Sequence, residues 1–366
     1  MEAVTVTILR YLLVALLAVA AVFADYSTSL KPGKAELKSA GALAFGPEGI
    51  LFIGDSMGAA VFALDTGDRK VRSSGPVEIK ALNEKVAALL GTSPDQILIN
   101  DVAVNPLSKR VYLSVSRGRG PDAAPMLLRT DASGKLEEVS LDKVKHARVG
   151  LPNAPDAAAK DRRGESLRLE AITDLAYVDG RVFIAGLSNE EFASKLRAVP
   201  FPFQEANQGT SVEIFHGAHG RFETNAPVRT FVPYAIQKEQ HILAAYTCTP
   251  LVKFPVSQLK PGAKVMGTTI AELGNRNRPL DMIVYRKGGS DYILMNNTSR
   301  GVMKMSTAKI HEYEGITKQT DITGLPYETL AELKGVEQLD RLDDLNVLML
   351  VRSEGGGLDL KTIALP

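Results

Sequence analysis

The sequence contains no tryptophan and a single cysteine, Cys248, and both absences narrow the kinds of site that the chain can hold. One thiol cannot form an intramolecular disulfide, and without a Cys-x-x-Cys or Cys-x-x-Cys-His motif we expect neither a zinc–thiolate cluster nor covalent c-type haem. Sites for carbohydrates and quinone cofactors commonly stack the ligand on indole, so the lack of tryptophan disfavours them. Without disulfides or a zinc–thiolate cluster, the stability of the fold must come from packing.

The charge of the chain is nearly balanced, with 43 Lys and Arg against 42 Asp and Glu, which leaves a formal net charge of +1. Because this balance supplies no summed field to attract phosphates, we expect no nucleic-acid partner. The chain also lacks a Gly-x-Ser-x-Gly elbow, a Walker loop and a His-Glu-x-x-His motif. The hydrolases and nucleotide-binding proteins recognised by those motifs lose their main support.

Residues 1–24 have the features of a cleaved signal peptide. Arg10 precedes an apolar run over residues 11–24, and Val22 and Ala24 supply small residues before a cleavage site at Asp25. The alternative, an uncleaved anchor, needs roughly 20 apolar residues to cross the hydrocarbon, which this run does not reach. We therefore expect an exported protein, periplasmic or secreted, with no membrane span after cleavage of the signal.

The rest of the chain repeats one unit: a short apolar strand, a tight polar turn, a second apolar strand with a small polar end, and a third strand. The copies cover residues 42–65, 101–131, 174–186, 232–254, 281–305 and 336–361. The equivalent second-strand ends are Asp55, Ser116, Leu187, Thr247, Asn297 and Ser353. Several strands per repeat, at this irregular but persistent spacing, predict an all-β fold, a β-propeller of six blades, with a seventh blade left open.

Three insertions interrupt the repeat. Residues 81–90 carry apolar side chains at helical spacing and stop at Gly91, which predicts a short helix on the second blade. Residues 153–165 show no periodicity and predict an exposed excursion, and the prolines of residues 197–210 predict an extended loop. A domain break near residues 150–165 is the alternative, but the repeat continues on both sides. We therefore expect a single β-propeller domain over residues 25–366.

The segment Phe-Gly-Pro-Glu-Gly-Ile-Leu-Phe-Ile-Gly-Asp-Ser, residues 45–56, resembles the repeat of the SMP-30/gluconolactonase, NHL and related six-bladed propellers. The resemblance covers nearly the whole chain after the signal as architecture, and this blade closely as sequence. For the gluconolactonase-like group it implies a divalent cation, usually calcium or zinc, held in the central channel by a Glu, an Asn and an Asp. Ala42 and Leu43 occupy the region where that Glu would be expected.

Three aspartates, Asp101, Asp174 and Asp281, each open a first strand. In a propeller that strand lines the channel, so the three carboxylates are expected to converge; with a one-residue gap Glu337 aligns with them, and Asn100 is adjacent. Oxygen ligands from separate strands suit Ca2+ or another divalent cation. Two alternatives remain: the aspartates accept backbone N–H bonds and line a water-filled channel, or they do general acid–base work.

Two other groups are weighed as surface features. His216 and His219 form a His-x-x-His pair flanked by glycines, which favours a turn over a metal site, and Cys248 is interpreted as a small packed residue.

Four basic residues lie in or beside loops at residues 117–125, 187–210 and 298–301, or at blade ends. They are Arg117, Arg119, Arg278 and Arg300, and they favour an anionic ligand unless they are only solvated surface.

The sequence thus supports two functional hypotheses. The first is an exported binding protein that holds a small molecule or a protein partner at the channel mouth. The second is a metal-dependent hydrolase of the lactonase or esterase type, with a cation on Asp101, Asp174 and Asp281 as Lewis acid. Whether the protein is an enzyme stays open at this point.

Overall fold

The structure, a computed structural model, describes residues 26–71, 75–120, 122–131, 133–248 and 250–366. The predicted signal peptide lies outside these residues. Within the described ranges, no helix has the length and apolar character needed to cross a membrane. The same ranges contain one α-helix, α2 (Leu82–Leu90), seven short 3-10 turns and 28 strands.

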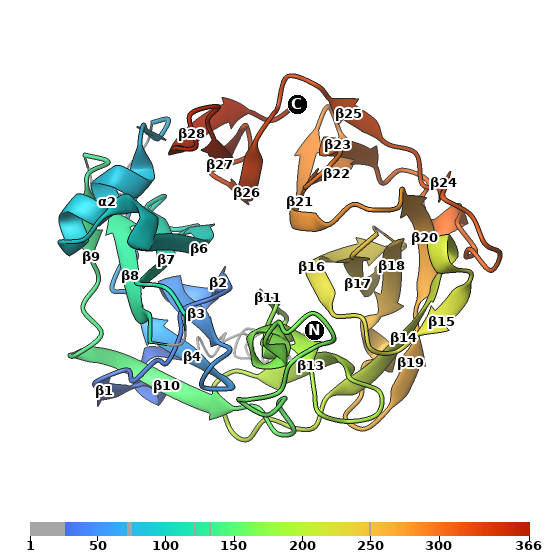
Figure 1. Ribbon diagram of the computed structural model, residues 1–366, viewed down its shortest axis with the longest axis horizontal. Helices are drawn as coiled ribbons and strands as arrows, with labels where there is room; N and C mark the ends of the chain where they lie inside the picture. The colour runs from blue at the N-terminus through green and yellow to red at the C-terminus, as the bar shows by residue number, and fades with distance from the viewer. Residues whose placement is uncertain (1–25, 72–74, 121, 132, 249) are drawn as a thin grey trace, which may run out of the picture.

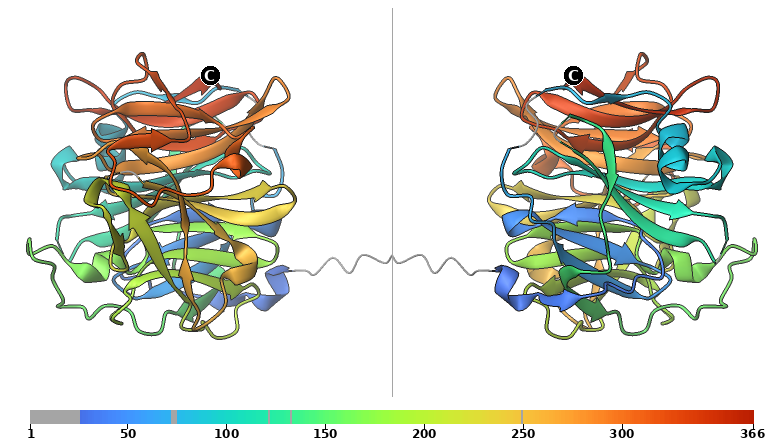
Figure 2. Two further views of the ribbon diagram at one scale, coloured as in Figure 1. Left: turned by 90° about the vertical axis from the view of Figure 1, so that its right-hand side faces the viewer. Right: turned by 90° about the vertical axis from the view of Figure 1, so that its left-hand side faces the viewer.

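The strands form six sheets, antiparallel except for one pair in blade 3, that are arranged as blades around a central axis (Figure 1). Figure 2 shows from the side that the strands run between the two faces of this ring. Numbered by the order of their inner strands in the chain, the first three blades are as follows. Blade 1 contains β2 (Leu43–Phe45), β3 (Ile50–Asp55), β4 (Ala60–Asp65), β10 (Val144–Gly150) and β1 (Lys31–Gly33); blade 2 contains β6 (Ile97–Val104), β7 (Val111–Arg117), β8 (Ala124–Thr130) and β9 (Leu136–Glu138); blade 3 contains β11 (Asp174–Val178), β12 (Arg181–Leu187), β13 (Ser194–Pro200), β14 (Thr210–His216) and β15 (Arg221–Glu223), with β19 (Lys264–Met266) parallel to β14.

The last three blades have four or five strands each. Blade 4 contains β16 (Val228–Ile236), β17 (Glu239–Tyr246), β18 (Pro250–Pro255), β20 (Thr268–Leu273) and β24 (Ile322–Gly324); blade 5 contains β21 (Pro279–Lys287), β22 (Ser290–Asn297), β23 (Gly301–Ser306) and β25 (Glu328–Leu330); blade 6 contains β26 (Val336–Arg341), β27 (Asn346–Arg352), β28 (Leu358–Ala364) and β5 (Glu78–Ile79). The second strands β3, β7, β12, β17, β22 and β27 end within one residue of the predicted positions. The prediction of a six-bladed propeller is confirmed, and no seventh sheet occurs in the described residues.

The hydrophobic core consists of six clusters, each at the junction of two neighbouring blades. The second strands are buried on both faces because each lies between two such clusters; in β3 all six residues are buried. A blade that buries its faces only against neighbours requires a closed ring, which is why the repeat and the ring imply each other.

The blades do not follow one another around the ring in chain order. Contacts between inner strands run β6, β2, β11, β16, β21, β26 and back to β6, so blade 1 stands between blades 2 and 3 (Figure 1). After β4 the chain adds β5 to the outer edge of blade 6, builds blade 2, and then returns through β10 to complete blade 1. Blade 6, the last in the chain, is therefore completed by a strand from the first half of the chain, and blade 1 is completed by a strand that follows blade 2 in sequence.

The predicted helix at residues 81–90 is confirmed as α2. It buries Leu82, Val86 and Leu90 in the cluster between blades 2 and 6. It ends at Gly91, whose φ of 63° is the left-handed conformation that glycine adopts at little cost. The helix therefore supports the closing junction of the ring rather than blade 2 alone.

Of the other two predicted insertions, one is confirmed and one is wrong in part. Residues 153–165 form the expected exposed excursion. The predicted loop at residues 197–210 is wrong for its first part, because β13 continues to Pro200 and fully buries Arg197. The remaining residues connect the far end of β13 to β14. Proline at a strand end is compatible with pairing, so Pro200 did not end the strand early.

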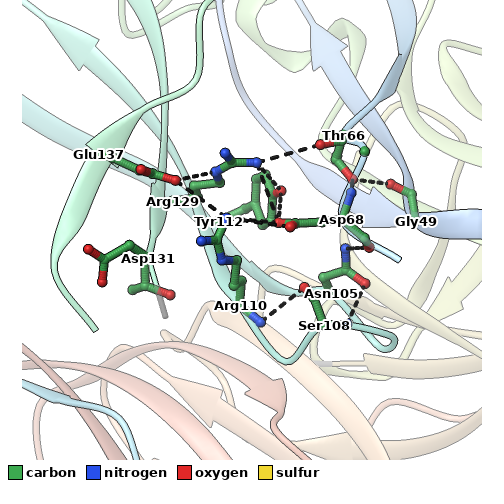
Figure 3. A network of polar contacts seen from close by, with 12 residues as sticks. Gly49, Thr66, Asp68, Asn105, Ser108, Arg110, Tyr112, Arg129, Asp131 and Glu137 are labelled. Carbon is green, nitrogen blue, oxygen red and sulfur yellow. Dashed lines mark hydrogen bonds and ion pairs between the residues drawn. The ribbon is translucent and has the colours of Figure 1, made fainter. Parts of the chain in front are cut away.

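A buried polar cluster joins blades 1 and 2 behind their shared apolar core (Figure 3). The Asp68 carboxylate, 6 % exposed, accepts a hydrogen bond of 2.6 Å from the Tyr112 hydroxyl. Arg110 and Arg129 lie within 3.4 and 3.5 Å of the same carboxylate, and Arg129 also donates to Glu137 at 2.6 Å. A carboxylate surrounded by two guanidinium groups and a hydroxyl is satisfied although it is buried.

Candidate functional site: the central channel and its mouth

The inner strands of all six blades line a central cavity of about 800 Å3. Register and burial identify one equivalent position per blade, each followed by a buried apolar residue. These positions are Ala42, Asp101, Asp174, Thr230, Asp281 and Gln338. Three of the six are aspartates, so the structure brings Asp101, Asp174 and Asp281 to the same level of the channel, as expected from their strand positions.

Four inner strands carry a β-bulge directly before this position. The bulge residue is Asn100, Arg229, Leu280 or Glu337, according to the blade. A bulge inserts one residue into one strand and turns its side chain away from the regular alternation. The repetition of the bulge explains why neighbouring residues at these strand starts have different surroundings.

Glu337 lies elsewhere than the alignment with the aspartates predicts. It is the bulge residue of blade 6 and forms an ion pair with Arg352, outside the set of side chains that line the channel. Gln338 takes the channel position instead. Asn100 is the corresponding bulge residue of blade 2, and its amide donates to the backbone oxygen of Ala40 at 2.8 Å and to the Ser116 hydroxyl at 2.9 Å.

A fourth carboxylate, Asp340, was not among the predicted site residues. It lies two residues after Gln338, and alternation along β26 therefore brings it to the same face, lining the channel. The position two residues beyond the shared one is Ala103, Ala176 or Ile283 in the blades that carry the other three aspartates, so an alignment on those aspartates does not indicate Asp340.

Each of the four carboxylates uses both oxygens as acceptors for backbone N–H groups. One oxygen accepts the N–H of the following residue, and the other accepts an N–H from the neighbouring blade. The bonds between blades join Asp101 to Leu43, Asp174 to Phe231, Asp281 to Leu339 at 2.7 Å each, and Asp340 to Val104 at 2.6 Å. This geometry matches the structural alternative considered above, in which the aspartates accept backbone N–H bonds.

The channel holds these carboxyl groups in an environment that opposes ionisation. Burial raises the pKa of Asp101 to about 8, that of Asp174 to about 7 and that of Asp340 to about 6. Burial and the nearby charge of Asp101 raise the pKa of Asp281 well above its usual value. Near neutral pH the channel is therefore a mixture of protonated and ionised carboxyl groups.

A second cavity, of about 750 Å3, lies at the channel mouth where second strands end. It meets the channel at Ala42, Asn100, Thr173 and Arg229, which line both. Apolar side chains form part of its wall, and two of them, Leu98 and Leu169, are 46 % and 54 % exposed. The mouth cavity is thus a half-apolar space, and residues 157–172, which include the end of the excursion, form part of its wall.

Basic side chains gather at this mouth. Lys38, Arg119, Lys160, Arg229 and Arg278 line it, against the single acidic residue Glu170. The Arg229 guanidinium pairs with Glu170 at 2.6 Å, and Arg119 donates to the backbone oxygens of Asp95 and Ile97. Two of the predicted anion ligands, Arg119 and Arg278, therefore lie at one cavity.

The other two predicted basic residues lie apart from it. Arg117, at the end of β7, is exposed outside the cavity lining. The Arg300 guanidinium lies against Gly274, where an added Cβ would come within 2.2 Å of it. The loop at residues 201–209 is also remote, because it follows the end of β13 that faces away from the mouth.

No family model matches the chain, and no curated protein matches it. The resemblance of residues 45–56 to SMP-30 and NHL propellers therefore remains an interpretation of that segment.

Solved structures similar to this chain include three proteins of 10–13 % identity. The first, described as an oxidoreductase (glucose dehydrogenase) from Thermus thermophilus, is 13 % identical over 91 % of this chain and 100 % of that chain, with a TM-score of 0.31. The second is the PQQ-bound aldose sugar dehydrogenase of Streptomyces coelicolor, 10 % identical over 92 % of this chain and 97 % of that one, with a TM-score of 0.34. The third is the extracellular domain of a one-component system from B. thetaiotaomicron, 10 % identical over 90 % of this chain and 39 % of that one, with a TM-score of 0.32. At these TM-scores the similarities carry no argument about activity.

Proposed function

We propose that this propeller is a binding protein for a small organic anion, held at the channel mouth. The observation that carries the proposal is the state of Arg278. Its guanidinium lines the mouth cavity, and no acidic side chain of the described residues forms an ion pair with it. Burial and the neighbouring charge of Arg229 lower its pKa. The one nearby carboxylate, Glu170, offsets part of this repulsion but is already paired with Arg229 at 2.6 Å. One carboxylate between two guanidinium groups leaves a net positive charge, which favours a further anion at Arg278.

The shape of the mouth suggests which anions fit. Leu98 and Leu169 leave apolar surface exposed beside the arginines, and the cavity volume suits a ligand of small-molecule size. The carboxyl groups of the channel lie beneath, so a negative group is favoured at the mouth rather than deeper. These features support an amphipathic ligand with one carboxylate or phosphate and an apolar body.

The experiment is a thermal-shift screen of carboxylates and phosphate esters that carry an apolar group, followed by calorimetry on those that stabilise the protein. Hydrogen bonds to charged groups contribute about 1.5–3 kcal/mol, so Arg278→Ala should weaken binding about 10- to 100-fold. Arg119→Ala should weaken it as well. Arg117→Ala is the matched control and should bind normally, because Arg117 lies outside the cavity. Binding that survives Arg278→Ala would contradict the proposal.

The alternative proposal is a divalent cation on Asp101, Asp174 and Asp281 that serves a lactonase- or esterase-type hydrolase. Burial raises the pKa of Asp281 most, and the nearby charge of Asp101 raises it further; a cation would remove that repulsion, which favours this alternative. The bonds to backbone N–H groups already engage each oxygen, which weighs against it. The test is the metal content and Ca2+-dependent melting temperature of the wild type and Asp174→Ala, and a metal-free protein indifferent to Ca2+ would reject it.

We also propose that the protein is exported, because residues 1–24 have the features of a signal peptide. We expect the mature chain to begin at Asp25 and to bind its ligand in the periplasm or outside the cell. N-terminal sequencing of the protein recovered from an exporting host checks this, and a chain that retains residues 1–24 would contradict it.

A further inference from the structure

Three side chains from separate parts of the sequence lie together on the rim of the ring. His216 ends β14, His219 ends the short turn η5 (Gly217–His219), and Cys248 lies in the turn after β17. Each offers one ligand atom, and these atoms all lie within 4.8 Å of one another. Within the described part of the chain, no other three His, Cys, Asp or Glu residues bring one ligand atom each this close together. The two histidines come from blade 3 and the cysteine from blade 4.

Glu223, on β15, orients both imidazoles. The Nδ1 atoms of His216 and His219 lie 2.9 and 2.7 Å from its two carboxylate oxygens. An ionised carboxylate only accepts hydrogen bonds, so each Nδ1 carries the proton and each Nε2 is left with a free lone pair. Histidines that bind metals are commonly held by a carboxylate on the opposite nitrogen in this way.

The Nε2 atom of His216 supplies an independent observation. His216 is 2 % exposed, and its Nε2 has no hydrogen-bond partner among the described residues. Buried polar atoms are nearly always paired, and an unpaired one calls for a missing partner. The imidazole rings of His216 and His219 lie 3.9 Å apart between centroids, so the second ring is beside the first.

The turn that carries the histidines is fixed by blade 4. The Gly217 N–H donates to Glu272 at 2.5 Å, and the Thr269 hydroxyl donates to the Phe215 oxygen at 2.6 Å. A Cβ at Gly217 would approach the Glu272 side chain to 2.8 Å, so the close contact requires glycine. Figure 1 shows β14 and β15 beside β20 at the outer edge of the ring. The histidines are therefore held in place before any ion arrives.

Cys248 lies in blade 4, and its backbone has a conformation that is uncommon for cysteine. Its φ is +64°, which is uncommon for a residue with a Cβ, and its N–H donates to the Asn277 oxygen at 2.6 Å. The side chain is partly exposed. The turn thus directs a thiol towards the two imidazoles and leaves it accessible to ions in solution.

We propose that Nε2 of His216, Nε2 of His219 and Sγ of Cys248 bind one transition-metal ion of the zinc and copper class. Two imidazoles and a thiolate are ligands that such ions prefer, whereas calcium and magnesium prefer oxygen. On binding, the thiol releases its proton to solvent and no group is oxidised or reduced. Three protein ligands leave a fourth position open for water or an exogenous ligand. This site is separate from the residues of the proposed anion site.

The experiment titrates the metal-stripped exported chain with Co2+, a spectroscopic probe for zinc sites. We expect one equivalent to bind, with a sulfur-to-cobalt charge-transfer band and visible d–d bands that Zn2+ abolishes by displacement. Cys248→Ser should remove the charge-transfer band and weaken binding at least tenfold. Glu223→Gln should keep the band and weaken binding about 10- to 100-fold, since it acts through the histidines.

The control variant is His311→Gln, at an exposed histidine of η7 (Ile310–Glu312), which should bind Co2+ as the wild type does. His219→Gln provides a second test at a side chain that is 38 % exposed and so tolerates substitution better than buried His216. A wild type without the charge-transfer band, or Co2+ binding unchanged by Cys248→Ser in a folded protein, would overturn the proposal.

Discussion

The carboxylate of Asp281 accepts the backbone N–H of Leu339, in the neighbouring blade, at 2.7 Å. Asp340, Asp101 and Asp174 make the same kind of bond, and all four reach in one direction around the ring. The bonds run from blade 5 to 6, 6 to 2, 2 to 1 and 3 to 4. The two remaining junctions start from Ala42 and Thr230, which carry no carboxylate. The channel aspartates therefore act as links between blades.

Removing one link should destabilise the ring. Asp281→Ala leaves the N–H groups of Leu339 and Met282 without their acceptor, and an unsatisfied buried donor costs about 1–3 kcal/mol. We expect the free energy of unfolding to fall by that amount in urea denaturation at about pH 5. The control is Asp344→Ala, whose side chain is 94 % exposed and which should change stability by less than about 0.5 kcal/mol. Equal stability of the two variants would contradict the role of Asp281.

Stability should fall as the pH rises. The channel carboxyl groups have a higher pKa in the folded than in the unfolded chain, so the folded state binds more protons between the two values. Their stabilising contribution is complete below about pH 4 and is lost as the pH passes through about 6, 7 and 8. Each unit of pKa difference corresponds to about 1.4 kcal/mol. Because these aspartates are partly exposed, solvent screening reduces the full effect to a few kcal/mol.

Denaturation curves at about pH 5, 6.5 and 8 measure this slope. Asp174→Asn removes one titrating group, whose pKa is about 7, and should flatten the dependence between pH 6 and 8. The same variant loses one acceptor, so its stability at pH 5 should also be lower than that of the wild type. A stability that rises with pH over this range would contradict the assignment, and so would a slope that Asp174→Asn leaves unchanged.

The polar cluster between blades 1 and 2 predicts a larger loss. Asp68→Ala removes the buried carboxylate that Arg110, Arg129 and Tyr112 share, while Glu137 still pairs with both arginines. The loss should therefore approach, but not exceed, the cost of about 3–5 kcal/mol for breaking a buried ion pair on one side. Asp131→Ala, at an exposed carboxylate near the same cluster (Figure 3), should cost far less. Thermal unfolding of the two variants makes the comparison, and a similar loss in both would show that the Asp68 cluster contributes little.

Substitutions in helix α2 test how strongly the stability of the ring depends on the junction between blades 2 and 6. Leu82 is fully buried between blades 2 and 6, so Leu82→Ala should cost about 2–5 kcal/mol. Leu89, on the same helix, is 42 % exposed, and Leu89→Ala should change stability by less than about 0.5 kcal/mol. Urea denaturation measures both. Equal effects would mean that the helix only covers the ring and does not hold it closed.

The sequence predicted the fold well because a propeller repeats its unit. Second strands are buried on both faces, so each leaves an uninterrupted apolar run that can be recognised without knowing its neighbours. The order of the blades could not be predicted, because β5 and β10 pair with strands far away in the sequence, β28 and β4, which they meet only in the folded ring. Pairing between distant strands leaves no local signal.

The candidate site was predictable in part for the same reason. Asp101, Asp174 and Asp281 share a repeat position, whereas Glu337 was aligned where Gln338 lies because a bulge adds one residue to β26. Asp340 lies two residues beyond that shared position and was missed. Arg229, another bulge residue, was missed at the mouth. His216 and Cys248 lie in different blades, and no spacing in the sequence indicates that their side chains meet. Such meetings follow only from the packing of one blade on the next.

A substitution of Arg278 should change the stability of the free protein and its anion binding in opposite directions. The Arg278 side chain is exposed and lies near Arg229, and Glu170, which pairs with Arg229, offsets only part of the repulsion between the two guanidinium groups in the ligand-free protein. Arg278→Gln should therefore leave the free protein as stable as the wild type or more stable by a few tenths of a kcal/mol, while anion binding is lost. Arg229→Gln should instead destabilise the free protein, because it leaves Glu170 without its partner at 2.6 Å. Melting temperatures with and without the bound anion separate these outcomes. If Arg278→Gln destabilises the free protein as much as Arg229→Gln does, Arg278 supports the structure and is not held ready for an anion.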